Sequence, residues 1–183
     1  MTDNHRAYLA AAASAADLVA APAVTRAWAS PSALVGFTVG GLAAHLAGQV
    51  LVVGDRLDLP EPAEEPVDLL GHYERVTWIG AGVDDDINVA IRKSGEEAAS
   101  VGPGDLAERL RSAVDELTVR LPREPAHRRV SPPAGPWTLS LADFLVTRMM
   151  EIAVHSDDLA CSVPGRHHCA RSRTSAETAP GRR

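Results

Sequence analysis

The spacing of apolar residues along the chain predicts helices. Apolar side chains recur at the period of one face of an α-helix in several long stretches. Pro22 ends the first stretch, and Thr38 can act as the N-cap of the second. The motif Gly102-Pro103-Gly104 interrupts the third stretch, which we expect to form one bent element in two pieces. The predicted long helical elements are residues 3–21, 38–56, 84–121 and 139–160.

The stretches between these elements have the composition of exposed loops. Residues 58–68 are rich in Pro and Glu, and residues 122–136 are rich in Pro and Arg. A short helix is expected within residues 69–80. The three aspartates at 84–86 are interpreted as a helix start, because acidic residues there complement the helix dipole without an ion. Four long helices with one long crossing connection predict an all-α fold, specifically a four-helix bundle.

The apolar pattern stops after Val163. Residues 164–183 contain no Leu, Ile, Val, Phe or Trp, and they are rich in arginine. Such a segment cannot bury enough apolar surface to order itself. The sequence therefore predicts a helical domain at residues 1–163 followed by a disordered basic tail at residues 164–183. His167 and His168 lie in that tail and are poor ligand candidates.

Composition narrows the classes of protein that the chain can represent. The apolar residues are mostly Ala, Leu and Val, which favours helices over sheets. A net charge of −6 argues against binding to nucleic acid or to an anionic membrane, and no run of about 18 apolar residues is present to span a bilayer. Only two cysteines occur, Cys161 and Cys169, so we expect a cytoplasmic protein. Lys93 is the single lysine among many arginines, and this preference for arginine indicates a high-GC genome.

Candidate chemistry lies in the last predicted helix. Glu151 and His155 are four residues apart, so they project from one face about 6 Å apart along the axis. Apolar residues share that face, and a carboxylate and an imidazole are costly in such surroundings unless they are paired. His45 is the histidine within a strongly apolar helical run and is the natural third member of a metal site. A His, Glu and His set leaves a coordination position free, as in catalytic zinc sites.

These residues also allow an interpretation without a metal. His45 would then be a buried histidine bonded to a carbonyl group, and Glu151 would pair with His155 or with Arg148. The spacing of Glu151 and His155 alone is a weak signal. Both interpretations stay open on these residues.

A family resemblance adds to this interpretation. It rests on Trp28, on Phe-Thr-Val-Gly-Gly-Leu-Ala-Ala-His-Leu at residues 37–46, and on Glu-Ile-Ala-Val-His-Ser-Asp-Asp-Leu-Ala at residues 151–160. Together these segments resemble the metal-binding domain of mycothiol-dependent maleylpyruvate isomerases, within the DinB-like superfamily. The resemblance implies an up-and-down four-helix bundle and a divalent metal, usually zinc, held by His45, Glu151 and His155.

The resemblance also implies thiol chemistry. Mycothiol, a low-molecular-weight thiol, would be the cosubstrate, and its metal-bound thiolate would attack a small electrophile in a transferase or isomerase-like reaction. The alternative is a non-catalytic metal-binding or interaction module on the same bundle.

Four further polar residues are weaker candidates. Asn88 and Arg92 lie one helical turn apart and could contact a substrate carboxylate, although an exposed helix face is at least as good an interpretation. Asp157 and Asp158 follow His155 closely. One of them could accept a hydrogen bond from a metal-bound imidazole, or both could be surface carboxylates at a helix end.

Overall fold

The computed structural model describes residues 1–164, and it is predominantly helical. This confirms the all-α prediction. The predicted tail, residues 164–183, lies outside the described residues apart from its first residue. In chain order the elements are α1 (Asp3–Val19), α2 (Pro22–Arg26), α3 (Val39–Asp58), α4 (Leu69–Tyr73), α5 (Asp86–Ala99), α6 (Pro103–Arg120), the 3₁₀ helix η1 (Leu121–Arg123), β1 (Arg129–Val130), β2 (Leu139–Ser140) and α7 (Leu141–Cys161).

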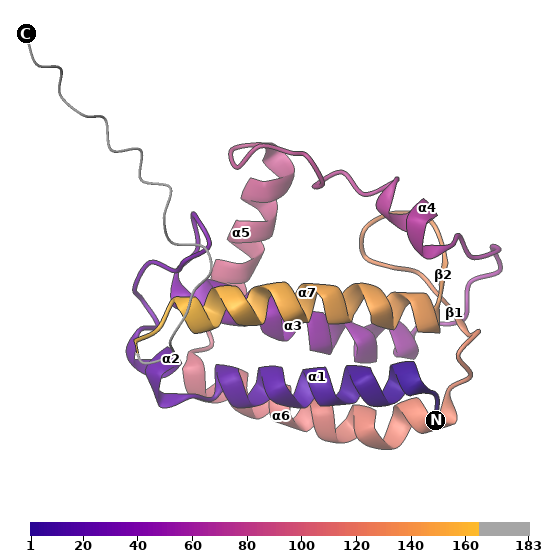
Figure 1. Cartoon of the computed structure of the whole chain (residues 1–183), viewed down its shortest axis with the longest axis horizontal. Coiled ribbons are helices and arrows are strands. Elements are labelled where there is room, and N and C mark those ends of the chain that lie inside the picture. The colour runs from indigo at the N-terminus through magenta and orange to yellow at the C-terminus, as the bar shows by residue number, and fades with distance from the viewer. Residues whose placement is uncertain (165–183) are drawn as a thin grey trace, which may run out of the picture.

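The long helices α1, α3, α6 and α7 lie side by side along a common direction (Figure 1). Both α1 and α3 pack against α6 and against α7, so the four helices enclose one core. The core is built from Leu, Val, Ala and Phe side chains on the inward faces. Fully buried members on α3 and α7 include Leu42, Leu46, Val50, Val53, Leu141, Phe144, Leu145 and Leu159.

The prediction for the third element is wrong. Residues 86–99 and 103–120 are two separate helices and do not form one bent element. Gly102 has φ 86°, in the left-handed region that favours glycine, so the chain turns there, and Pro103 then starts α6. Figure 1 shows α5 standing across the direction of the long helices, where it packs on α3. Only α6 contributes to the group of four.

Smaller differences concern the element ends. The short helix expected within residues 69–80 is α4, which ends at Tyr73. The fourth long helix starts at Leu141, because Leu139 and Ser140 pair with residues 129–130 in a two-stranded antiparallel sheet. Strands of two residues are too short to show a period in the sequence.

Close contact between α3 and α5 depends on glycines and on one glutamate. A Cβ atom on Gly95 would lie 2.9 Å from the Gly41 carbonyl oxygen, so a side chain there would push the helices apart. Glu96 accepts hydrogen bonds from the backbone N–H of Thr38 at 2.7 Å and from its hydroxyl at 2.8 Å. The Thr38 hydroxyl oxygen in turn accepts from the Gly41 N–H, as predicted for an N-cap. The start of α3 is thus fixed to α5.

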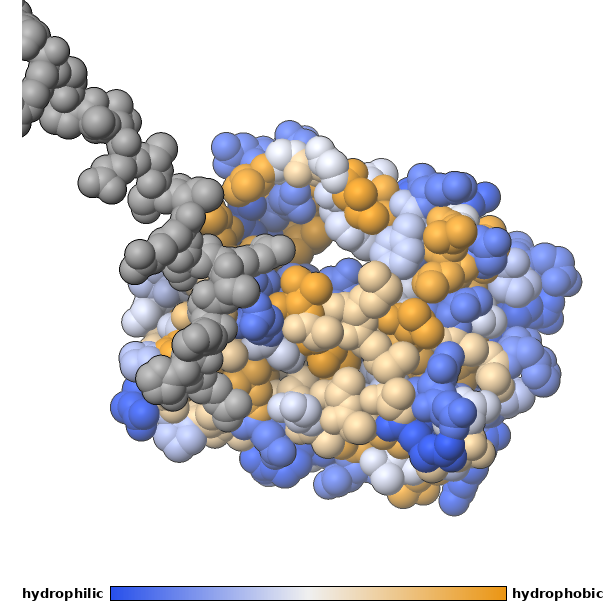
Figure 2. All heavy atoms as spheres, viewed as in Figure 1, coloured by the Kyte–Doolittle hydropathy of each residue, from blue (hydrophilic) through white to orange (hydrophobic). Residues whose placement is uncertain are grey.

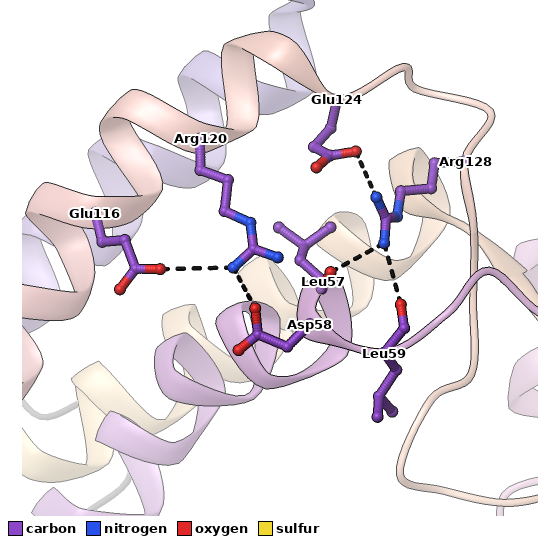
Figure 3. A network of polar contacts seen from close by, with 7 residues as sticks. All are labelled: Leu57, Asp58, Leu59, Glu116, Arg120, Glu124 and Arg128. Carbon is purple, nitrogen blue, oxygen red and sulfur yellow. Dashed lines mark hydrogen bonds and ion pairs between the residues drawn. The ribbon is translucent and has the colours of Figure 1, made fainter.

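A polar network holds the other end of α3 (Figure 3). Arg120 on α6 donates a hydrogen bond to Asp58 at 2.7 Å. Arg128 donates to Glu124 at 2.8 Å and to the backbone carbonyl of Leu57 at 3.0 Å, one of the carbonyls that a helix end leaves unpaired. The residues of the network are Leu57, Asp58, Leu59, Glu116, Arg120, Glu124 and Arg128.

None of the helices within residues 1–164 has the length and the apolar character that crossing a membrane requires.

Candidate metal centre

The middle of α7 places Glu151 and His155 on the face that the sequence predicts. Ser140 caps this helix by accepting a hydrogen bond from the Asp143 N–H at 3.0 Å, which sets the start of the helix and the direction of each later side chain. One turn separates the two side chains, and His155 Nε2 lies 3.2 Å from Glu151 Oε2. Both side chains are half-buried.

His45 reaches the same point from α3. Its ring lies edge-on to the ring of His155, with the two ring centroids 4.6 Å apart. One ligand atom from each of His45, Glu151 and His155 lies within 4.8 Å of the others. Within residues 1–164 this is the one group of three or more His, Cys, Asp or Glu side chains that converges in this way.

The spacing of these atoms suits a small cation. Donor atoms on a tetrahedral zinc ion lie about 3.4 Å apart when each bond is about 2.1 Å. The 3.2 Å between His155 Nε2 and Glu151 Oε2 is close to that value, and a cation would draw the remaining atoms inward by small side-chain rotations. The donor set of two imidazoles and one carboxylate is one that zinc accepts in open, catalytic sites.

The surroundings of His45 and Glu151 shift both pKa values toward the protonation states that bind a cation at neutral pH. Burial, together with the nearby charge of His155, lowers the pKa of His45 to about 4, so this imidazole is neutral at pH 7. Burial alone would raise the pKa of Glu151, but hydrogen bonding with His155 and the charge of Arg148 outweigh it and hold the pKa below its usual value. A neutral imidazole and an ionised carboxylate are the forms that bind metals.

Asp158 lies behind His155. The Oδ2 atom of Asp158 is 3.3 Å from His155 Nδ1, and Asp158 is only 8% exposed. Asp157 is exposed. Of the two aspartates that the sequence left open, the structure therefore brings Asp158 to the imidazole. When Nδ1–H donates to this carboxylate, an unprotonated Nε2 can bind a cation in place of its contact with Glu151, the arrangement usual for metal-bound histidines.

The interpretation without a metal fits these contacts only in part. Glu151 does pair with His155, as that interpretation expects. However, the ring of His45 makes no hydrogen bond to a carbonyl group within residues 1–164. Arg148 makes no ion pair with Glu151 at 4.0 Å or less, and it donates to Gln49 instead.

Asn88 and Arg92 are not part of the converging group. Asn88 Nδ2 donates to the carbonyl oxygen of Gly82 at 2.9 Å, and Arg92 Nη1 donates to that of Val83 at 2.6 Å. Both side chains thus tie the segment before α5 to that helix. Their role in substrate binding stays a prediction.

A cavity of about 210 Å³ opens beside His45, and neither Glu151 nor His155 lines it. His45 lies in its wall. Gly48 and Gln49 on α3, Gly95 on α5, and Arg148 on α7 line it further. Figure 2 shows an opening between the body of the helices and the segment that joins α4 to α5. Nothing in the sequence predicted a role for Gln49, and Arg148 was considered only as an ion-pair partner of Glu151, although each is a polar residue within a mainly apolar helical face.

The helices and the converging side chains define an all-α domain with a candidate metal centre. Residues 8–160 match the sequence model of the family described as the mycothiol maleylpyruvate isomerase N-terminal domain. The match covers most of the chain, so the chain belongs to this family, which confirms the resemblance drawn from its motifs. Comparisons with curated proteins and with solved structures give no significant match.

Proposed function

We propose that the protein is a metal-dependent thiol transferase or isomerase-like enzyme, with mycothiol as cosubstrate and a small electrophile as substrate. The observation that carries this proposal is the convergence of His45, Glu151 and His155 within 4.8 Å, with a cavity that His45 lines. Family membership supports mycothiol as the thiol. It also supports a DinB-like up-and-down arrangement of the bundle within residues 1–163 and work in the cytoplasm, where thiols stay reduced.

The three side chains would hold a divalent metal, and we propose zinc. Bound there, zinc would supply a Lewis acid with a free coordination position, at which a thiol is deprotonated. His45 and His155 would each contribute a ring nitrogen, and Glu151 would contribute negative charge. Asp158 keeps the His155 ring in the orientation that presents Nε2.

The rest of the site would position the electrophile. The cavity wall is mostly small or apolar, with Ala44, Gly48 and Val52 among its residues. Such a wall leaves room for a compact substrate beside His45. Asn88 and Arg92 on α5 remain proposed substrate contacts. To bind a substrate, they would have to give up their present hydrogen bonds to the carbonyl oxygens of Gly82 and Val83.

A fluorogenic thiol assay tests the proposal. Zinc-loaded protein is mixed with mycothiol and monochlorobimane; a sulfur–carbon bond forms, chloride leaves, and the thiol proton passes to solvent. We expect turnover above the uncatalysed rate in the natural protein and in His127→Ala, which changes an exposed histidine. We expect none in His45→Ala.

Absence of turnover in fully zinc-loaded natural protein would contradict an enzymatic role with this acceptor and favour the alternative, a non-catalytic metal-binding module. Equal turnover in His45→Ala would contradict the role of the metal in catalysis.

A further inference from the structure

Arg148 is a buried cation whose described partners are all neutral. The residue is 7% exposed. Its Nε donates to the hydroxyl oxygen of Thr147 at 3.1 Å, and its Nη1 donates to the side-chain oxygen of Gln49 at 2.6 Å. The guanidinium carbon lies 5.4 Å from the centre of the Phe144 ring. Within residues 1–164, no carboxylate lies within 4.0 Å of this guanidinium.

A buried charge without a direct ion-pair partner is costly to the fold. Burial lowers the pKa of Arg148, and the negative charge of Glu151 opposes that shift only in part. An arginine nevertheless stays protonated in proteins. An apolar residue of similar volume would pack at this position at lower cost. Glu151 attracts this charge without pairing with it, so the guanidinium is open to direct pairing with the anionic group of a ligand.

The guanidinium retains donors for such an anion. Arginine has five N–H groups, of which Thr147 and Gln49 accept two. Nη2 makes no hydrogen bond within residues 1–164, and it is not among the fully enclosed unpaired atoms of that part of the chain. Gln49 fixes the plane of the fork, as a site for a planar carboxylate requires.

The cavity brings this cation next to the candidate metal ligands. Arg148 and His45 lie in the same cavity wall, so a molecule bound to one faces the other. Gly48 also lines the cavity, and a Cβ atom added there would meet nothing within 4 Å. Space for a ligand is therefore continuous from the imidazole to the guanidinium.

We propose that Arg148, held by Gln49, forms a subsite for the carboxylate of a small electrophile and orients its reactive carbon toward the metal side of the cavity. This inference rests on the proposed function. It makes Arg148 a specificity-determining residue that acts through substrate binding.

Two matched electrophiles test the subsite. Monomethyl fumarate carries a carboxylate and dimethyl fumarate carries none. Both accept a thiol across the double bond: sulfur bonds to one alkene carbon, a proton adds to the other, and nothing leaves. In Arg148→Met we expect kcat/KM for monomethyl fumarate to fall about 10- to 100-fold, mostly through KM, as for a lost hydrogen bond to a charged group. We expect the value for dimethyl fumarate to change less than about 3-fold.

A binding measurement separates this inference from the proposed function. Calorimetric titration of zinc-loaded protein with monomethyl fumarate, without thiol, should show binding in the natural protein and none in Arg148→Met, with equal zinc content in both. This result stands even if no thiol transfer is observed. Equal losses for the two esters, or unchanged binding in Arg148→Met, would overturn the inference.

Gly48→Leu provides a second variant if Arg148→Met does not fold. Its added side chain fills the cavity without removing any donor, so binding of monomethyl fumarate should be lost while zinc is retained. Full binding in the folded Gly48→Leu protein would also overturn the proposed subsite.

Discussion

Replacing Asp158 with asparagine tests whether the carboxylate behind His155 prepares that ring for a metal. Asparagine preserves the shape of the side chain but removes the negative charge that faces Nδ1. The backbone carbonyl of residue 158 would still accept from Ser162, as it does now at 2.7 Å, so the end of α7 should be unaffected. The substitution therefore isolates the contact between Asp158 and His155.

The structure sets the size of the expected effect. Loss of a carboxylate that orients a metal-bound histidine typically costs 10- to 100-fold in metal affinity. The distance of 3.3 Å between Nδ1 and Oδ2 is longer than the about 2.7–2.9 Å of strong charge-assisted hydrogen bonds. We therefore expect the lower end, about 10-fold, which corresponds to about 1.4 kcal/mol of zinc-binding free energy.

Competition against a chromophoric zinc chelator measures this change directly. Asp157→Asn is the matched control, because it removes the same charge from the neighbouring but exposed position. We expect the control to bind zinc within about 2-fold of the natural protein. Equal zinc affinity in Asp158→Asn and Asp157→Asn, with both proteins folded, would refute the role assigned to Asp158.

The remaining predictions concern the stability of the scaffold. Gly54→Ala should raise the free energy of unfolding by about 0.5–1 kcal/mol in urea titrations, because a Cβ there meets nothing within 4 Å and alanine favours the helix; no gain would contradict this. Gly95→Ala should lower it instead, since overpacking against the Gly41 carbonyl costs about 1–3 kcal/mol; stabilisation would disprove the tight α3–α5 contact. His72 is fully buried, and burial lowers its pKa from 6.5, so the unfolded chain takes up the proton first and stability should fall as the pH drops below about 6.5. In metal-free protein His72→Gln should reduce that acid sensitivity, because it removes the group that takes up the proton. Glutamine can still accept the Trp137 N–H, and identical pH slopes in the two proteins would contradict the assignment.

Helices with long apolar stripes could be predicted from the sequence, because their burial follows directly from spacing. The buried face of α7 is an example, and the N-cap at Thr38 could be predicted from its residue type and its place before an apolar run. The separation of α5 from α6 could not be predicted from the sequence, since it depends on the positive φ of Gly102 and on the packing of α5 across α3. Periodicity reports which face of a helix is buried and not the direction in which the next helix runs.

The candidate site shows the same division. The pairing of Glu151 with His155 follows from their spacing within one helix, and the apolar run around His45 indicated which histidine would join them. The hydrogen bond between Arg148 and Gln49 joins residues 99 positions apart, and nothing local in the sequence marks it. His167 and His168 lie outside the described residues, so their exclusion as ligands stays a prediction.

Zinc stoichiometry in matched variants tests the central claim most directly. After equilibrium dialysis against buffered zinc, elemental analysis should give about one zinc per chain in the natural protein, in His127→Ala and in the double variant His167→Ala/His168→Ala. His45→Ala, Glu151→Gln and His155→Ala should each retain far less zinc while remaining helical by circular dichroism. Undiminished zinc in all three site variants, or no zinc in the natural protein, would contradict the claim that these side chains form a metal centre.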